Sequence, residues 1–484
     1  MRNRIIVLVA TELVAMAYSI ATDAVDYSKG IFFVNEDWYG HQNSSVNFLV
    51  PDDPDGDFWH YRVIRQENPG MELGCTNQFG ALWNGKLYFI SKQEKDPGAN
   101  ISGGRITVAD ASTMKIIHQQ ERIDPSGAQC DGRAFVGVDE HKAYISTSNG
   151  VWIFNTDKNL IIGQIAGTSN PNAGSDDKPN TDPTGALYHG QCGTMILASG
   201  KVFVAHQQYG LLVIDSVADN VTDIISMDVV QEGAGIGAMV RSKDGDIWLS
   251  VAKNRQGTGA FLNYIVRVEP ESLNYEIIEI SADMYPPGNS WYAWTPDAFV
   301  ASSVQNCLYW KGGPNRWFTG SIIYKYDIDT RTQSVFVNLE DDPDDWKLYG
   351  CSLGVDPISD EVYMSLYHNF GTPVYIVRRY DADGKKIRDY EMIQNYWFPS
   401  HLLFPQQPEA SSIDSITADT ISLSYSGDML HIMGAEGLDC SVYNMQGRRL
   451  CYFIVESEKS SVTLSLSSGI YLVKVGNVTQ KIAI

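Results

Sequence analysis

Short apolar runs of about five residues, separated by small polar turns, recur along most of this chain. The clearest series lies between residues 193 and 225 and consists of Thr194–Ala198, Lys201–Ala205, Leu211–Asp215 and Val221–Ile225. These runs are rich in Val, Ile, Leu and Phe, and Ser, Gly, Asp and Asn stand between them, which predicts short β-strands joined by tight turns. Four antiparallel strands in series form a meander, which is one blade of a β-propeller.

The same group of four runs recurs along the chain. The groups cover residues 79–119, 134–165, 194–225, 237–280, 298–338 and 352–391. Their period of roughly 40–60 residues is in the range of propeller blades. The sequence therefore predicts six complete blades in chain order.

The two ends of this region complement each other. Gly30–Asn35, Ser45–Val50 and Trp59–Gln66 are three expected strands with no first strand before them, and His401–Pro405 is a lone strand with no successors. Joined, they make a seventh blade, which ties the ends of the ring together and removes exposed sheet edges. A β-sandwich also has short strands at regular spacing, but six serial groups with complementary ends favour an all-β, seven-bladed β-propeller over residues 27–409.

The pattern changes after a short polar linker at residues 410–413. Seven further short strands predict a small immunoglobulin-like β-sandwich over residues 414–484. The expected strands are Thr420–Tyr425, Met429–Met433, Asp439–Asn444, Arg449–Phe453, Ser461–Ser465, Gly469–Val475 and Val478–Ile484.

The N-terminus has the layout of a signal peptide over residues 1–21. Arg2 and Arg4 precede the apolar run Ile5–Ala21, which ends in small residues, although Glu12 interrupts it. No cysteine ends the run, so a bacterial lipoprotein anchor is not indicated, and no later stretch approaches the ~20 apolar residues of a membrane span. We expect a protein that is exported, either secreted or at the cell surface of a Gram-negative bacterium.

Charge narrows the class of partner. The formal net charge is −22, which repels phosphate backbones, so nucleic acid is not expected as a partner. Aromatic residues make up 11% of the chain, and Trp and Tyr suit both β-sheets and contact surfaces.

Candidate chemistry gathers on one face of the predicted ring. In a propeller, one face carries both the loops between second and third strands and the connections between blades. Pockets form where such loops converge on a rigid scaffold. Here these segments are rich in His, Arg, Trp, Tyr, Asn and Gln, whereas the opposite face carries ordinary turns such as Asn84-Gly85. The predicted ligand-binding residues are Trp38, Tyr39, His41, Gln78, Arg133, Tyr188, His189, His206, Gln207, Tyr209, Arg255, Trp291, Trp294, Arg316, Trp317, His368, Tyr396 and Trp397.

Aromatic rings beside amides and guanidinium groups suit a flat ligand or a sugar, through stacking and directional hydrogen bonds. The same rings could instead pack loop against loop. Catalysis has weaker support, from Tyr188 with His189 and from His206 with Tyr209. No nucleophile elbow, phosphate-binding loop or zinc-protease motif occurs, so we expect binding rather than catalysis, assign no catalytic residue and identify no cofactor.

Two other patterns are interpreted as structural. Cys75, Cys130, Cys192 and Cys351 each precede a predicted channel strand and could ring the mouth for a soft metal, but small residues also fit a crowded channel. The acidic loops at residues 52–57 and 341–345 lack the glutamate spacing of a calcium-binding EF-hand. No metal site is therefore predicted. Cys440 and Cys451 could pair, although spacing alone does not decide a disulfide.

The C-terminal module resembles the sorting domain of the type IX secretion pathway. The residues that carry the resemblance are 440–450 (CSVYNMQGRRL), 466–475 (LSSGIYLVKV) and the closing QKIAI at 480–484. The resemblance implies export across both membranes of a bacterium with two membranes, with removal of the tail as a further step. A purely structural sandwich is the alternative.

The propeller region resembles the YncE-like surface-layer propellers that lie beside outer-membrane transporters. The pattern is carried by GIFFVNE at 30–36, by GTM at 193–195 with VFV at 202–204, and by GSIIYKYD at 320–327. This resemblance implies capture of a small molecule or glycan for a TonB-dependent outer-membrane transporter, and cobalamin is the ligand of one branch. A polysaccharide lyase and a protein–protein scaffold remain the alternatives.

Overall fold

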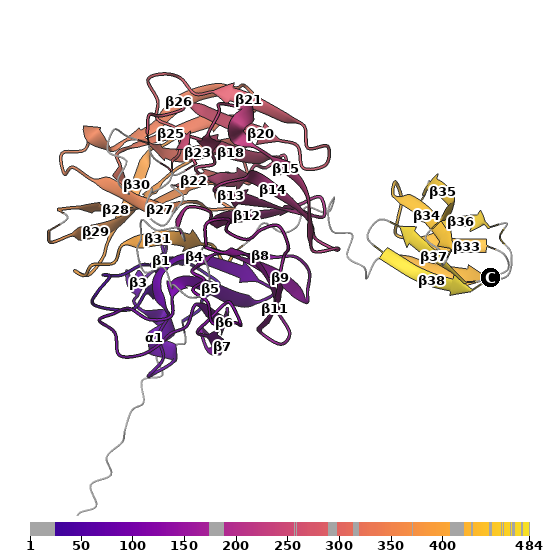
Figure 1. The fold of residues 1–484 in the computed structure, drawn as a ribbon, viewed down its shortest axis with the longest axis horizontal. Helices are drawn as coiled ribbons and strands as arrows, with labels where there is room; N and C mark the ends of the chain where they lie inside the picture. The colour runs from indigo at the N-terminus through magenta and orange to yellow at the C-terminus, as the bar shows by residue number, and fades with distance from the viewer. Residues whose placement is uncertain are drawn as a thin grey trace, which may run out of the picture. The chain divides into compact units, whose positions relative to one another are not determined.

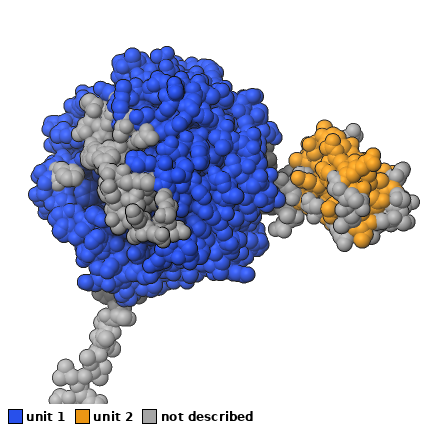
Figure 2. Space-filling view, in the orientation of Figure 1, with its two compact units in different colours: residues 1–406 blue, residues 407–484 orange. Residues whose placement is uncertain are grey.

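The computed structural model describes two stretches of the chain. The first is residues 25–406 apart from 174–187, 256, 258, 289–297, 313–318 and 370. The second is residues 421–483 apart from 427–428, 445–447, 456, 458, 465, 467–469 and 476–477. The chain divides into two compact units, residues 1–406 and residues 407–484 (Figure 2), and each is described by itself.

The first unit is a ring of four-stranded antiparallel sheets (Figure 1). Six sheets take their strands in chain order, as the sequence predicts. Their strands are β4 (Cys75–Trp83), β5 (Lys86–Gln93), β6 (Ile106–Asp110), β7 (Ile116–Gln120); β8 (Gly132–Gly137), β9 (Lys142–Thr147), β10 (Gly150–Asn155), β11 (Leu160–Gln164); β12 (Cys192–Ala198), β13 (Lys201–His206), β14 (Gly210–Asp215), β15 (Asn220–Ile225); β17 (Met239–Arg241), β18 (Ile247–Val251), β20 (Tyr264–Val268), β21 (Tyr275–Glu279); β22 (Phe299–Ala301), β23 (Cys307–Gly312), β25 (Ile322–Asp327), β26 (Thr332–Asn338); and β27 (Lys347–Val355), β28 (Val362–His368), β29 (Val374–Tyr380), β30 (Lys386–Glu391).

The seventh sheet joins the two ends of the unit. Strand β31 (Pro399–Leu403) pairs antiparallel with β1 (Ile31–Asn35), so that Phe33 faces Leu402. Strands β2 (Ser45–Leu49) and β3 (Trp59–His60) complete the sheet, and Figure 1 shows β31 beside β1. The predicted closure of the ring is confirmed, and this sheet is called the closing blade below.

One expected strand in the closing blade, Trp59–Gln66, is shorter than predicted. The chain leaves the sheet after His60 and forms the short helix α1 (Val63–Glu67) in place of a strand to residue 66. Arg62 has a left-handed φ of 55° and its backbone N–H donates to Asn47 Oδ1 at 2.9 Å, which turns the chain. The adjacent apolar residues Val63 and Ile64 can then both be buried, which a strand with alternating faces would not allow.

The core of the ring lies between neighbouring blades. Phe203 and Leu211 of one blade pack with Leu249 and Val266 of the next, and all four are fully buried. At the tight turns Asn84-Gly85 and Ser199-Gly200 the φ angles are 49° and 71°, which are the left-handed values of a two-residue hairpin turn. Two further pairings lie in the described loops: β16 (Ala234–Gly235) pairs with β19 (Lys253–Asn254), and β24 (Thr319–Gly320) pairs with the start of β27.

The second unit is a sandwich of two antiparallel sheets, as predicted. One sheet has the order β32 (Ser422–Ser426), β33 (Met429–Met433), β36 (Lys459–Thr463), and the other β35 (Arg449–Ile454), β34 (Asp439–Asn444), β37 (Ile470–Val475), β38 (Val478–Ala483). Leu430, Ile432, Val442 and Val473 are fully buried in the core that both sheets share. All seven cysteines of the chain, including Cys440 and Cys451, are free thiols.

None of the helices in the described residues has both the length and the apolar character that crossing a membrane requires.

Candidate ligand-binding face

Three loops of the predicted binding face are fastened to one another. They are residues 36–44 between β1 and β2, residues 94–105 between β5 and β6, and residues 392–398 between β30 and β31. The Asp37 N–H donates to Trp397 O at 3.0 Å, and the Gly40 N–H donates to Asp96 Oδ2 at 2.8 Å. These bonds make a rigid edge on the closing blade.

An aromatic stack stands on this edge. The Trp38 ring lies between His41, at a centroid distance of 3.6 Å, and Tyr396, at 4.2 Å, with interplanar angles of 30° and 22°. The Tyr396 hydroxyl donates to Gly371 O at 2.7 Å. Trp38 is still 41% exposed and Tyr39 58% exposed, so ring edges remain open to a ligand. We call Trp38, His41 and Tyr396 the aromatic stack.

A buried carboxyl, that of Asp37, directly precedes Trp38 of the aromatic stack in the chain. Asp37 is 3% exposed and accepts a hydrogen bond from Gln42 Nε2 at 3.1 Å. Burial raises the pKa of Asp37 to about 7, although the Ser45 hydrogen bond and the charges of Arg62 and Arg65 oppose the shift. The Asp37 carboxyl therefore changes its charge near neutral pH.

A second group of polar residues surrounds the mouth of the central channel. Glu36 Oε1 accepts from Gln78 Nε2 at 2.6 Å, and Glu36 Oε2 accepts from the Tyr349 hydroxyl at 3.5 Å. Arg133 Nε donates to Gln191 Oε1 at 2.9 Å, and Arg133 Nη2 lies 3.8 Å from Asp131 Oδ2. We call Glu36, Gln78, Lys92, Asp131, Arg133 and Tyr349 the channel-mouth cluster.

Burial is the largest cause of the pKa shifts of Glu36 and Lys92 in this cluster. It raises the pKa of Glu36 and lowers the pKa of Lys92 to about 7, a shift that the charge of Arg133 reinforces. Asp131 is 1% exposed and accepts from Arg105 Nη1 at 3.0 Å and from the Tyr188 hydroxyl at 3.2 Å. Such a cluster can present both donors and acceptors to a polar group that enters the channel. Thr76, Gln78, Lys92 and Arg133 line a cavity of about 40 Å³ here.

The predicted His206 site has a structural role. His206 is fully buried, its Nδ1 accepts from the backbone N–H groups of Gln208 and Tyr209 at 3.1 and 3.2 Å, and its ring stacks on Tyr209 at 4.3 Å. Burial lowers the pKa of His206 to about 4, so the imidazole is neutral at pH 7. Gln207 is 1% exposed and its Oε1 accepts from the Gln191 N–H at 3.3 Å. Among these residues Tyr209 alone, at 36% exposure, reaches the surface.

The other predicted residues are spread around the ring. Arg255 Nη2 pairs with Asp228 Oδ2 at 2.5 Å, the His368 ring meets Trp346 edge-on at 4.5 Å, and the His189 carbonyl accepts from Gln208 Nε2 at 2.6 Å. Trp291, Trp294, Arg316 and Trp317 lie outside the described residues.

Trp397 belongs to the core and not to the surface of this face. Its side chain is 1% exposed, its ring stacks on Tyr61 at 5.3 Å and its Nε1 donates to Ile393 O at 2.9 Å. A ligand therefore cannot reach the Trp397 ring in this conformation. The structure thus brings together Trp38, His41 and Tyr396 at one point and Gln78, Arg133 and Tyr188 at another.

Sequence reasoning selected aromatic rings, amides and histidines, and it missed Glu36, Lys92, Asp131 and Tyr349. A usable signal was present, because Glu36 and Lys92 each follow a predicted second strand directly, at the start of a loop on the binding face. An ionisable residue at the end of an otherwise apolar strand is rarely buried without a partner. Pairing the acidic and basic strand ends would have pointed to the channel-mouth cluster.

The cysteines and the acidic loops have the following surroundings in the structure. Within the described ranges no group of three or more His, Cys, Asp or Glu residues could hold a metal ion. Burial raises the pKa of Cys75 and of Cys130 to about 12, so these thiols are protonated at neutral pH. Asp53 Oδ1 accepts from the Asp55 and Asp57 N–H groups at 2.9 and 3.0 Å, which is the hydrogen bonding of an aspartate-capped turn.

The geometry defines the class of protein as a seven-bladed β-propeller with a polar, aromatic face and a separate β-sandwich unit. The family model described as a domain of unknown function, DUF5074, matches residues 29–405, and the chain belongs to this family. No curated protein matches the chain.

Solved structures offer distant likenesses. The extracellular domain of a two-component-system protein from B. thetaiotaomicron is 14% identical with a TM-score of 0.47, over 95% of this chain and 58% of that one. Apo AztD from Citrobacter koseri is 12% identical with a TM-score of 0.40, over 89% of this chain and 96% of that one. The present chain thus spans little more than half of the first protein, and no functional statement follows from these likenesses.

Proposed function

We propose that this chain is an exported propeller that captures a small molecule or a glycan on the face that carries the aromatic stack. The observation that supports it most is the position of the stack. Trp38, held between His41 and Tyr396, stands on the same edge of the closing blade as Glu36 of the channel-mouth cluster. The exposed parts of the aromatic stack thus lie close in the chain to groups for directional hydrogen bonds, a combination that suits a sugar or a flat ring system.

The leader-like pattern at residues 1–21 and the resemblance to surface-layer propellers support a role beside a TonB-dependent outer-membrane transporter. In this proposal the propeller holds the ligand reversibly and releases it to the transporter unchanged. Cobalamin is one ligand to test, and soluble glycans are the other class. A lyase reaction has less support, since the buried, neutral His206 is turned into the protein.

Replacing Trp38 with Ala is expected to weaken ligand binding about tenfold or more, because the variant loses a pre-ordered aromatic surface. Cyanocobalamin and a panel of soluble glycans would be titrated against the full chain, with calorimetry and tryptophan fluorescence as readouts. Tyr275→Ala is the matched control, because Tyr275 is 45% exposed on the outer strand β21 and its removal leaves the binding face intact.

Two results would contradict the proposal. One is a Trp38→Ala protein that binds every ligand as the unaltered chain does. The other is release of unsaturated, ultraviolet-absorbing products from a uronate-containing glycan, which would establish a lyase. Binding of a protein partner alone, with no small ligand, would favour the scaffold alternative.

We propose further that the C-terminal sandwich directs secretion through the type IX pathway. If so, deleting residues 414–484 leaves the propeller folded in the periplasm and abolishes its appearance at the surface, as cell fractionation and surface protease digestion would show. Surface exposure of the shortened chain at the normal level would instead assign the sandwich a structural role. Export of a carrier protein fused to residues 407–484 is the complementary measurement.

A further inference from the structure

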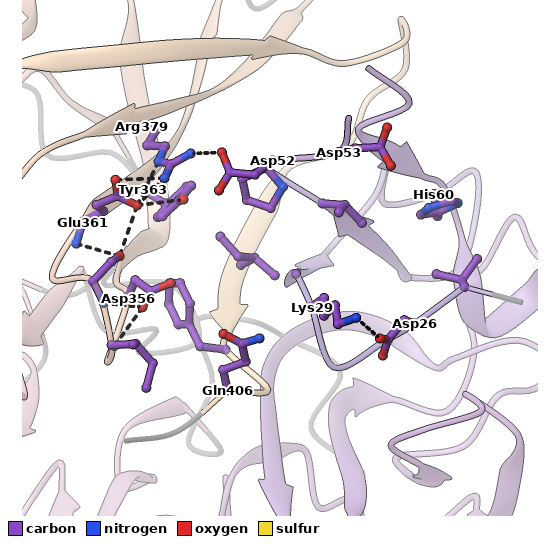
Figure 3. A pocket seen from close by; sticks show the side chains of 18 of the residues that line it. Asp26, Lys29, Asp52, Asp53, His60, Asp356, Glu361, Tyr363, Arg379 and Gln406 are labelled. Carbon is purple, nitrogen blue, oxygen red and sulfur yellow. Dashed lines mark hydrogen bonds and ion pairs between the residues drawn. The ribbon is translucent and has the colours of Figure 1, made fainter. Parts of the chain in front are cut away.

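A cavity of about 650 Å³ opens on the face opposite the aromatic stack. It lies at the seam between the closing blade and the blade β27–β30, and we call it the seam pocket (Figure 3). Its walls come from the start of β1, the turn between β2 and β3, the turn between β27 and β28, and the segment after β31. The volume is in the range of small-molecule sites, about 300–1,000 Å³.

The residues that line the seam pocket are partly apolar and partly charged; we call Ile31, Pro51 and Phe404 its floor and the charged side chains its rim. Ile31, Pro51, Ile358 and Phe404 supply apolar surface. The charged side chains are five carboxylates and two cations, which leaves a formal charge of −3 with His60 neutral. A pocket lined by both apolar and charged residues fits a ligand that has an apolar body and charged groups.

Both cations of the rim already have anionic partners. Arg379 forms a forked pair with Glu361, at 2.9 Å from Nε and from Nη2, and its Nη1 lies 2.8 Å from Asp52 Oδ1. Lys29 Nζ lies 3.0 Å from Asp26 Oδ2. Figure 3 shows the Arg379 and Lys29 pairs on different sides of the opening. An anionic ligand would have to displace these carboxylates, so the rim disfavours anions.

Two carboxylates remain without a cationic partner among the described residues. Asp53, after β2, and Asp356, after β27, each use one oxygen as a turn acceptor, Asp356 Oδ1 accepting from the Ile358 and Ser359 N–H groups at 2.8 and 3.0 Å. The second oxygen of each carboxylate has no such bond in the described part of the chain. Figure 3 places Asp53 and Asp356 on different walls of the opening.

We propose that the seam pocket is a second binding site, for a small organic cation whose two positive groups are joined by an apolar chain. One positive group would pair with Asp53 and the other with Asp356, while the chain between them covers the apolar floor. The ligand would touch both blades that meet at the seam, so its binding stabilises the closed ring by mass action. This site is separate from the aromatic stack and stands whether or not the proposed ligand capture is correct.

The probe for this proposal is agmatine, which carries a guanidinium and an ammonium group on a four-carbon chain. Titrated into the full chain at low salt, agmatine is expected to bind by calorimetry and to raise the melting temperature, whereas 1,4-butanediol and succinate do neither. Added salt should weaken binding, because partly exposed charges are screened. Binding of the diol as tight as that of agmatine, or no agmatine binding at millimolar concentration, would overturn the proposal.

The double variant Asp53→Asn/Asp356→Asn is expected to weaken agmatine binding at least ~10-fold, since each amide keeps its turn hydrogen bonds but loses its charge. Asp110→Asn/Asp215→Asn is the matched control, because those two aspartates accept the same kind of turn bonds outside the pocket. Equal affinity in the two double variants would place agmatine elsewhere and refute the assignment. Trp38→Ala should leave agmatine binding unchanged, which separates this site from the aromatic stack.

Discussion

A chain that ends after Phe398 is expected to lose the folded propeller, whereas a chain that ends after Gln406 keeps it. The shorter chain lacks β31, the innermost strand of the closing blade. Without it β1 has an unpaired edge, and Leu402 and Leu403 no longer fill the core. The Ser400 hydroxyl, which lies 2.9 Å from Asn77 O and 3.1 Å from Val34 O and can donate to either, is lost as well. Burial of the two leucines alone contributes roughly 2 kcal/mol each.

The free energy of unfolding of a typical domain is about 5–15 kcal/mol, so the loss of a whole strand removes most of this stability. The open ring also exposes sheet edges that invite aggregation. The two chains would be compared by circular dichroism melting and by size-exclusion chromatography, and the chain ending after Gln406 serves as the control for loss of the second unit. A shorter chain that is monomeric and melts as cooperatively as the longer one would show that the ring does not depend on its closing strand.

The fold could be predicted to this depth because its information is local and repeated. Each blade is a meander of consecutive strands, so the apolar runs at 194–225 and their tight turns define β12 to β15 without any long-range knowledge. The closing blade needed one long-range inference, and the complementary end fragments supplied it. The helix α1 was missed because a run with Val63 and Ile64 reads equally well as a strand; only the turn at Arg62 decides between the two.

The candidate site was predictable as a face but not as a set of contacts. Sequence order places Trp38 and Tyr396 in loops of the same blade, so their meeting follows from ring closure. Sequence order does not tell which aromatic ring is buried. Tyr396 and Trp397 are adjacent in the chain, yet Trp397 is buried and Tyr396 is partly exposed. The seam pocket was not predicted, because its walls come from four separate segments whose side chains carry no common motif.

Two buried histidines also make the stability of the folded protein depend on pH. Burial lowers the pKa of His206 and of His401 to about 4, so each histidine contributes stability that is lost as the pH falls from about 6.5 to about 4. The Asp37 carboxyl acts in the opposite direction, since its pKa is raised. The effect of Asp37 must therefore be measured as a difference between two proteins that share both histidines.

The free energy of unfolding of the Asp37→Asn variant is expected to rise relative to that of the unaltered chain as the pH rises from about 4 to about 8. The pKa of Asp37 is raised from 3.8 to about 7 in the folded protein, so the unfolded chain releases this proton first and the folded state loses stability across that interval. A shift of about three pH units corresponds to about 4 kcal/mol, at 1.36 kcal/mol per unit. The amide of Asn carries no charge at any of these pH values, and its oxygen can still accept from Gln42 Nε2.

Urea unfolding of the two proteins at a series of pH values gives this difference directly, and the histidine contributions cancel in it. Parallel stability curves would mean that Asp37 ionises in the folded protein as easily as in water. Because Asn395 Nδ2 lies 3.5 Å from Asp37 Oδ1 and precedes Tyr396 in the chain, ionisation of Asp37 also bears on the aromatic stack. Tryptophan fluorescence of the unaltered chain should therefore change near pH 7, and the change should be absent in Asp37→Asn and in Trp38→Ala.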